Sequence, residues 1–270
     1  MKIFKSILVF IFAITLIACE KSEEKSKVLK VGTVAGPETE LMEAARDVAK
    51  KSGLNIEIVT FVEYILPNTA LVDGLIDANA MQSEHYFESL LKATGYDLVR
   101  AGYTFIYPMG VYSTNHSDIK SLPQGARIAI PNDASNEARG LQVLAQAGLI
   151  TLNPEPQGAD FTQVDIKENP LALQFIAIDA AQLPRMLGDV DAAVINTNFA
   201  MPAGLLPDRD AIFVEEVNPQ YANIIAVKAG HENDPRIQEL VKAYQSDEVV
   251  AMAEKLFEGQ AIPAWKYLQQ

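Results

Sequence analysis

The chain has 270 residues, 49% of them hydrophobic, with 15 glycines, 14 prolines and one cysteine. This composition suits one large or two smaller globular domains, and it excludes a disordered or fibrous protein. The formal charge of -13 at pH 7 argues against nucleic acids and anionic membrane surfaces as partners, because binding to either needs a concentrated basic surface.

The N-terminus is typical of an export signal. Lys2 and Lys5 are followed by an uncharged apolar run over residues 6–18, which is short for a membrane span. The run ends in "LIAC", which resembles the lipobox of bacterial lipoproteins. Cys19 could be an inert thiol, a reactive thiol or an attachment point, and its place after the apolar run favours attachment of acyl chains such as palmitate. We therefore predict a signal peptide over residues 1–18 and a lipid anchor at Cys19.

The first folded half is predicted to alternate between strands and helices. Residues 19–27 are mostly charged, which predicts a solvated tether, and the folded part is expected to begin near residue 28. Periodicity and stop signals predict strands over 28–34, 55–61 and 76–81, and helices over 41–53, 67–75 and 84–95.

The second half repeats this order, with strands predicted over 126–133, 173–179 and 189–196 and helices over 135–148 and 180–187. "GLIDANAM" and "GDVDAAVI" share a pattern, and a Leu-Pro pair precedes each of them. The agreement favours two similarly built α/β lobes with mostly parallel sheets. Ligands of such sheets gather at the carboxyl ends of the strands, so we expect a cleft between the lobes.

Catalytic motifs are scarce. The sequence contains no G-x-S-x-G, no H-E-x-x-H and no glycine-rich phosphate loop. His85, His116 and His231 are scattered, and no pair of carboxylates stands out as an acid/base couple. We therefore expect no enzyme activity, no metal and no cofactor.

Polar residues follow several predicted strands. Arg139 lies near the start of a predicted helix, where a cation is unexpected, so it either points into solvent or faces an anion. Asn196 and Asn198 are two positions apart, and Asn223 precedes another apolar run. A guanidinium and side-chain amides together suit the carboxylate and ammonium of a free amino acid.

Aromatic and apolar residues near loops could form either core or a side-chain pocket. Buried tyrosines need partners for their hydroxyls, which favours a pocket if their loops converge on the cleft. The candidates are Tyr64, Met81, Tyr86, Tyr103, Phe105 and Tyr107.

Several motifs together resemble the methionine-binding lipoproteins of ABC importers, the MetQ/NlpA family. They are "VTFVEYILPN", "GLIDANAMQ", "TFIYPMGVYS", "IPNDASNEARGL", "AAQLPRML", "DAAVINTNFA" and "AYQSDEV". The resemblance runs in order from about residue 28 to the C-terminus. It implies a two-lobed periplasmic-binding-protein fold of type II-like architecture, with lobe 1 over 28–110 and 225–270 and lobe 2 over 111–224.

The same resemblance implies roles for individual residues. Arg139 would bind the ligand carboxylate, so the anion at the helix start would be the ligand itself. Asn223 and Asn198, or alternatively Asn196, would hold the head group. Tyr64, Tyr86 and Tyr107 would form the aromatic side-chain pocket.

One stretch departs from the family pattern. Where the family usually has Phe-Gln-His-Lys-Pro-Tyr, this chain has "MQSEHY", so Met81 replaces Phe and Ser83 replaces His. His85 is a candidate to refill the space. The departure leaves open a ligand other than L-methionine: D-methionine, a methionine-containing dipeptide or another apolar amino acid.

The resemblance predicts capture of a ligand rather than catalysis. The lobes would close on methionine, and the protein would deliver it to an ABC permease and its ATPase. It would be anchored to a bacterial membrane in the cell envelope, facing the periplasm or the exterior. An exported enzyme on this scaffold and a surface adhesin or structural lipoprotein are the alternatives.

Overall fold

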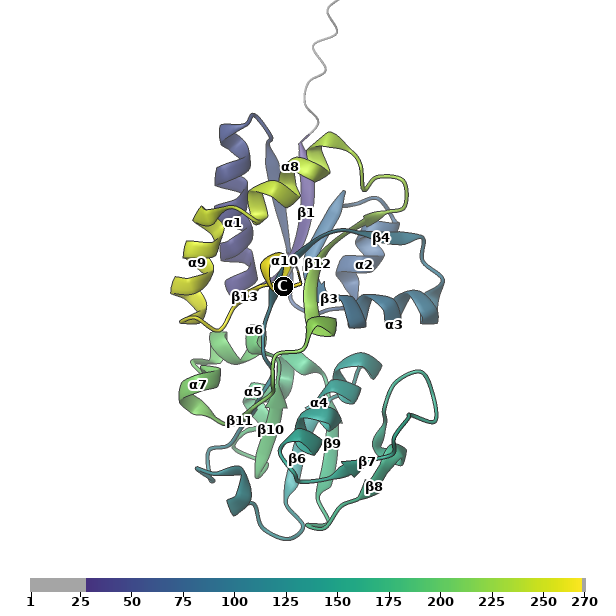
Figure 1. The fold of residues 1–270 in the computed structure, drawn as a ribbon, viewed down its shortest axis with the longest axis vertical. Coiled ribbons are helices and arrows are strands. Elements are labelled where there is room, and N and C mark those ends of the chain that lie inside the picture. Colours follow the sequence, from purple (N-terminus) through teal and green to yellow (C-terminus); the bar gives the residue numbers. More distant parts are fainter. Residues whose placement is uncertain (1–27, 269–270) are drawn as a thin grey trace, which may run out of the picture.

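The computed structural model describes residues 28–268, which form two α/β lobes stacked along the long axis of the molecule (Figure 1). The predicted signal peptide, Cys19 and the predicted tether over 19–27 lie outside the described residues. Within the described part of the chain, no helix combines the length and the apolar character needed to cross a membrane.

Lobe 1 is built on a six-stranded sheet of order β13-β4-β12-β3-β1-β2. Its strands are β1 (Leu29–Val34), β2 (Ile56–Phe61), β3 (Ala78–Ser83), β4 (Leu98–Ile106), β12 (Ala222–Lys228) and β13 (Ile262–Pro263). Its helices are α1 (Pro37–Lys51), α2 (Leu66–Val72), α3 (Glu84–Thr94), α8 (Pro235–Tyr244), α9 (Asp247–Phe257) and α10 (Ala264–Tyr267).

Helix α1 packs with α8 and α9 on one side of this sheet (Figure 1). Pro37 at the first helical position fixes a helical φ, while acidic residues in the first turn and Lys50 and Lys51 in the last complement the helix dipole. Leu41 and Met42 face inward and are fully buried with Leu29 and Val31 of β1. The start of α1 is thereby held at the carboxyl end of β1, beside the second lobe.

Lobe 2 is built on a five-stranded sheet of order β11-β5-β10-β6-β9, with a separate two-stranded sheet. Its strands are β5 (Gly110–Tyr112), β6 (Arg127–Pro131), β7 (Thr151–Leu152), β8 (Ile166–Glu168), β9 (Gln174–Ile178), β10 (Ala192–Ile195) and β11 (Ala211–Val214). Its α-helices are α4 (Ala134–Gln146), α5 (Leu183–Met186), α6 (Thr197–Ala200) and α7 (Pro207–Asp210). Short 3₁₀ helices are η1 (Ile119–Ser121), η2 (Gln163–Asp165), η3 (Ala180–Gln182), η4 (Met201–Ala203) and η5 (Pro219–Tyr221).

The pairing in both main sheets is mixed, not mostly parallel as predicted. Strand β1 pairs in parallel with β2 and β3, and β6 pairs in parallel with β9 and β10. Strand β12 runs antiparallel to β3 and β4, and β5 runs antiparallel to β10 and β11. Strands β5 and β12 each follow a crossover between the lobes. Each of them therefore runs in the direction opposite to its neighbours in the sheet.

The chain crosses from lobe 1 to lobe 2 between β4 and β5, and it returns between β11 and β12. The lobe boundaries expected from the sequence, 110/111 and 224/225, fall inside β5 and β12. The crossovers themselves are the loops that precede these two strands.

Candidate functional site

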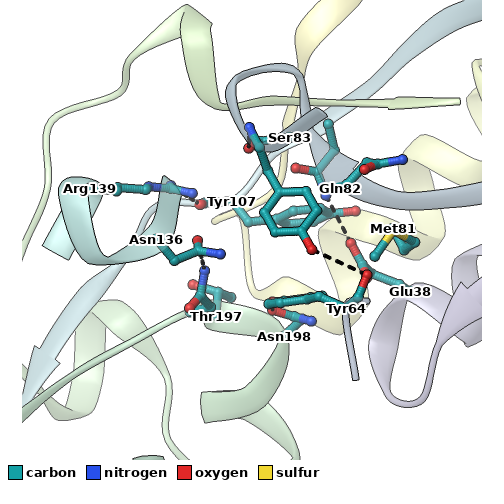
Figure 2. A pocket seen from close by; sticks show the side chains of 13 residues that line it. Glu38, Tyr64, Met81, Gln82, Ser83, Tyr107, Asn136, Arg139, Thr197 and Asn198 are labelled. Atoms are coloured by element: carbon teal, nitrogen blue, oxygen red, sulfur yellow. Dashed lines mark hydrogen bonds between the residues drawn. The ribbon is translucent and has the colours of Figure 1, made fainter. Parts of the chain in front are cut away.

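A cavity between the lobes is lined by residues of both and encloses about 420 Å³, including its opening to solvent. Figure 2 shows the polar and aromatic side chains that meet there. Lobe 1 contributes Glu38, Tyr64, Met81, Gln82, Ser83, Tyr86, Tyr107 and Asn223, and lobe 2 contributes Asn136, Arg139, Asn196, Thr197 and Asn198.

Arg139 is buried at the cavity, with 6% of its surface exposed, and its charge is paired with Glu215. Arg139 lies in the second turn of α4, and its Nε is 3.1 and 3.2 Å from the two carboxylate oxygens of Glu215. Its Nη2 also bonds Glu215 and donates to the Tyr107 carbonyl at 2.8 Å. The guanidinium carbon lies 4.1 Å from the centre of the Tyr221 ring.

The anion beside Arg139 is therefore the carboxylate of Glu215, a side chain of the protein itself. Glu215 holds one edge of the guanidinium fork, and the backbone N–H of Met109 donates to Glu215 Oε1 at 2.7 Å. Within residues 28–268, Arg139 Nη1 makes no hydrogen bond. This nitrogen remains available to an acceptor in the cavity.

Glu38 is the second acidic residue of the site, and the sequence interpretation missed it. It lies in the first turn of α1 and is 3% exposed, and its Oε1 accepts a hydrogen bond from Asn223 Nδ2 at 3.0 Å. Its Oε2 is buried and has no partner among the described residues. Burial raises the pKa of Glu38 from 4.5 to about 8, while the bond from Asn223 acts in the opposite direction.

Two asparagines at the end of β10 present further unpaired atoms. Asn196 Nδ2 donates to Asn136 Oδ1 at 2.8 Å, which leaves Asn196 Oδ1 buried without a donor among the described residues. Asn198 Oδ1 accepts from the Tyr64 hydroxyl, which leaves Asn198 Nδ2 buried without an acceptor in the same part of the chain. The site thus holds both donors and acceptors that need partners.

Tyr64 connects the two lobes directly. It lies in the loop after β2, and its hydroxyl is 2.6 Å from Asn198 Oδ1 in α6. Its ring centre is 4.9 Å from that of Phe199 in lobe 2 and 5.9 Å from that of Tyr86 in lobe 1. Burial raises the pKa of the Tyr64 hydroxyl well above its usual value, so this group remains a hydrogen-bond donor at neutral pH.

Met81 and Ser83, the residues that depart from the family pattern, lie at the end of β3. Met81 is 2% exposed and lines the cavity, and Ser83 Oγ accepts the Tyr86 N–H at 3.2 Å as the N-cap of α3. Serine at position 83 therefore has a local structural role. It starts the helix that carries Tyr86.

A cluster of buried side-chain amides supports this end of β3. Asn68 Nδ2 donates to Gln82 Oε1 at 2.8 Å, while Gln82 Nε2 donates to Asn68 Oδ1 and to Asn79 Oδ1, both at 2.8 Å. Asn79 Nδ2 donates to Asn68 Oδ1 at 3.0 Å. These bonds satisfy groups that would be costly to bury unpaired, and they fix the position of β3 behind the cavity.

His85 does not line the cavity, contrary to the expectation that it refills the space left by Ser83. In the first turn of α3, the inward position is taken by Tyr86, and His85 points to another side of the helix. Its Nε2 lies 3.2 Å from Asp160 Oδ1 of lobe 2, and its ring packs edge-on against Tyr221. The other residues to which the family resemblance assigns a role all line the cavity, whereas the pocket candidates Tyr103 and Phe105 do not and pack with the core of lobe 1 instead.

Nowhere in the described part of the chain do three histidine, cysteine or acidic side chains lie together in an arrangement that could hold a metal ion. The cavity instead presents a guanidinium edge, an amide donor, an amide acceptor and a buried carboxyl to whatever occupies it. Such a set matches a small zwitterion, and the cavity lies between two lobes joined by paired crossovers. The fold and cavity define a two-lobed substrate-binding protein.

Comparison with known proteins shows which protein family the chain resembles. Residues 29–265 match the model of the NlpA lipoprotein family. The probable D-methionine-binding lipoprotein MetQ of Vibrio cholerae is 44% identical over 247 residues, which cover 91% of each chain. The D-methionine-binding lipoprotein MetQ of Escherichia coli is 41% identical over 267 residues, or 98% of each chain.

A solved structure of a nutrient-binding protein from Burkholderia cenocepacia bound to methionine is also similar. It is 48% identical, has a TM-score of 0.85, and the match covers 87% of this chain and 99% of that one. The chain belongs to the NlpA lipoprotein family. The two-lobed fold and the family expected from the sequence are thus confirmed.

Proposed function

We propose that this protein is the substrate-binding lipoprotein of an ABC importer and that it captures methionine between its lobes. Its relatives include D-methionine-binding lipoproteins, and one similar solved structure is bound to methionine. These relatives are binding proteins, which supports binding without catalysis.

The single observation that carries the proposal is the set of polar atoms in the cavity that have no partner among residues 28–268. Asn198 Nδ2, which is buried, and Arg139 Nη1, which is not used in the bonds to Glu215 and Tyr107, can donate to a carboxylate, and both come from lobe 2. Asn196 Oδ1 and Glu38 Oε2 can accept from an ammonium. An α-amino acid supplies both charges about two bonds apart, so it would satisfy groups that are costly to leave unpaired.

The side chain of the ligand would lie among Tyr64, Tyr86, Tyr107 and Met81, which line the same cavity. A thioether gains about 0.3–1.5 kcal/mol for each contact with an aromatic ring, so methionine should bind more tightly than norleucine, which carries a methylene in place of sulfur. Met81 and Ser83 shape the end of this pocket, and a methionine-containing dipeptide or another apolar amino acid is the competing ligand.

Delivery would follow from closure of the lobes. The Tyr64–Asn198 bond and the contact of His85 with Asp160 both join lobe 1 to lobe 2. A permease with its ATPase is the partner that would recognise the closed form, and acyl chains on Cys19 would keep the protein at the membrane of the cell envelope. Mass spectrometry of the N-terminal peptide from the native host tests the anchor, and an unmodified Cys19 would contradict it.

Isothermal titration of protein purified under denaturing conditions and refolded tests the ligand. We expect one molecule of L- or D-methionine per chain, weaker binding of norleucine and no heat with acidic amino acids. If a methionyl dipeptide binds more tightly than methionine, the dipeptide would be the ligand, and the proposed role in transport would stand. No binding to any apolar amino acid or dipeptide would overturn the proposal and leave an adhesin or structural lipoprotein.

A further inference from the structure

We propose that Glu38 recognises the ammonium group of the ligand and that it changes from a neutral acid to a carboxylate as the ligand enters, releasing its proton to solvent. The inference rests on the proposed function and deepens it. It assigns the ammonium subsite to one side chain and makes uptake of the ligand dependent on pH.

The geometry of Glu38 supports this role. The residue is 3% exposed at the start of α1, and Asn223 occupies its Oε1, while Oε2 is buried without a described partner. Glu38 lines the cavity together with Arg139 and Asn198, and Figure 2 shows these side chains arranged around the same space. A zwitterion whose carboxylate meets Arg139 would therefore have its ammonium within the part of the cavity that Glu38 faces.

The charges around Glu38 explain why it would be neutral before the ligand arrives. Three tyrosine hydroxyls interact electrostatically with Glu38: Tyr64 from the loop after β2, Tyr107 from the loop after β4, and Tyr244 from α8. Burial raises the pKa of all three, so none of them ionises near neutral pH. The cation Arg139 is already paired with Glu215.

The described residues therefore offer Glu38 no unpaired cation, and burial holds its pKa at about 8. A ligand ammonium would supply the missing positive charge in surroundings of low dielectric. The N-terminal end of α1 also favours an anion at this position once the carboxylate has formed. The step balances: the protonated carboxyl loses its proton to water, and the resulting carboxylate pairs with an ammonium that keeps all its protons.

Asp133 is the other carboxyl near the cavity whose pKa burial raises, but it has a different place. It caps α4 and accepts hydrogen bonds from Asn136, while its electrostatic influence falls on Tyr64 and Tyr86. Comparing the unmodified protein with a variant at position 38 separates the two carboxyls.

Titration calorimetry in phosphate and in Tris, whose ionisation enthalpies differ, counts the protons released as methionine binds. At about pH 6.5 we expect about one proton per methionine, falling toward zero at about pH 8.5, with affinity rising over the same interval. Glu38→Gln should release almost none, and its affinity for methionine should fall about ten- to a hundredfold, because a charge-assisted bond is lost.

The matched ligand is 4-(methylthio)butanoate, which is methionine without its amino group. Its affinity should be nearly the same for Glu38→Gln and for the unmodified protein. Glu40→Gln, an exposed change on the same helix, is the control and should behave as the unmodified protein with both ligands. Proton release by the unmodified protein remains a readout even if the variant folds poorly.

The outcomes separate the inference from the function on which it rests. If the unmodified protein binds methionine but releases no proton at about pH 6.5, Glu38 is not the titrating acceptor. An equal loss of affinity for both ligands in Glu38→Gln would also overturn the inference, since it would indicate a general disturbance of the cavity. In either case methionine capture would stand, whereas no binding of methionine by the unmodified protein would overturn both.

Discussion

The hydroxyl of Tyr64 in lobe 1 donates to Oδ1 of Asn198 in lobe 2 at 2.6 Å, so one hydrogen bond spans the cavity beside the proposed ligand. The bond would break if the lobes moved apart. Tyr64→Phe should weaken methionine binding by about 1 kcal/mol, roughly fivefold, because closure loses one buried bond. Calorimetry measures the effect, and Tyr96→Phe in lobe 1, which does not line the cavity, is the control.

The buried pair of Arg139 and Glu215 predicts that folding stability can be restored by a second substitution while methionine binding is not. Arg139→Met leaves an uncompensated carboxylate and should lower the free energy of unfolding by about 3–5 kcal/mol. Adding Glu215→Leu should restore most of that loss, because a well-packed apolar pair can replace a buried ion pair. Urea unfolding measures both effects.

Both of these variants should bind methionine far more weakly than the unmodified protein, since the positively charged donor to the ligand carboxylate is gone in both. Arg209→Met breaks an exposed ion pair with Asp210 and should change neither stability nor affinity appreciably. Near-normal affinity in the double variant would show that the carboxylate is held elsewhere.

The amide cluster of Asn68, Asn79 and Gln82 predicts an effect on stability. Asn68→Ala removes the partner of Gln82 and Asn79, both of which are buried, and should cost about 1–3 kcal/mol of unfolding free energy. Thermal or urea unfolding checks this. Asn55→Ala changes an exposed asparagine and should have almost no effect. Equal stability of the two variants would contradict the role given to the cluster.

The raised pKa of Glu38 predicts how the stability of the ligand-free protein changes with pH. Between its ordinary value of 4.5 and about 8, the folded protein keeps a proton that the unfolded chain has lost. Stability should therefore fall with rising pH across this window, by at most about 1.4 kcal/mol per pH unit, and level off above it. Subtracting the curve for Glu38→Gln isolates this contribution from that of Asp133. Parallel curves for the two proteins would contradict it.

Local patterns predicted much of the fold. The helix predicted over 135–148 is α4 at 134–146, and the strand predicted over 76–81 is β3 at 78–83. Helix α1 begins at Pro37, before the predicted start at 41, although Pro37 and the acids after it are a usual first turn. The strands around the crossovers were not predicted, because their order depends on contacts between distant segments.

The limits of prediction at the site have the same origin. Arg139 and Asn198 follow strands and could be found from their positions, whereas Glu215 is 76 residues from Arg139 and carries no local sign of that pairing. Glu38 precedes the predicted start of the first helix at residue 41, so the sequence gives no sign of its burial. His85 was placed by spacing alone, and the helical turn that directs it to Asp160 depends on the cap formed by Ser83.

The described chain both starts and finishes in lobe 1, and β1 begins at the end of the sheet that is remote from lobe 2 (Figure 1). Any attachment made by residues before Val28 therefore grips the far end of lobe 1. Among the described residues, the backbone connects lobe 2 to lobe 1 through the two crossovers, and side-chain contacts such as the Tyr64–Asn198 bond add to them. Lobe 1 would then stay fixed relative to the membrane while lobe 2 moves. A membrane-bound partner would therefore find lobe 1 at a constant distance and would detect closure through the position of lobe 2.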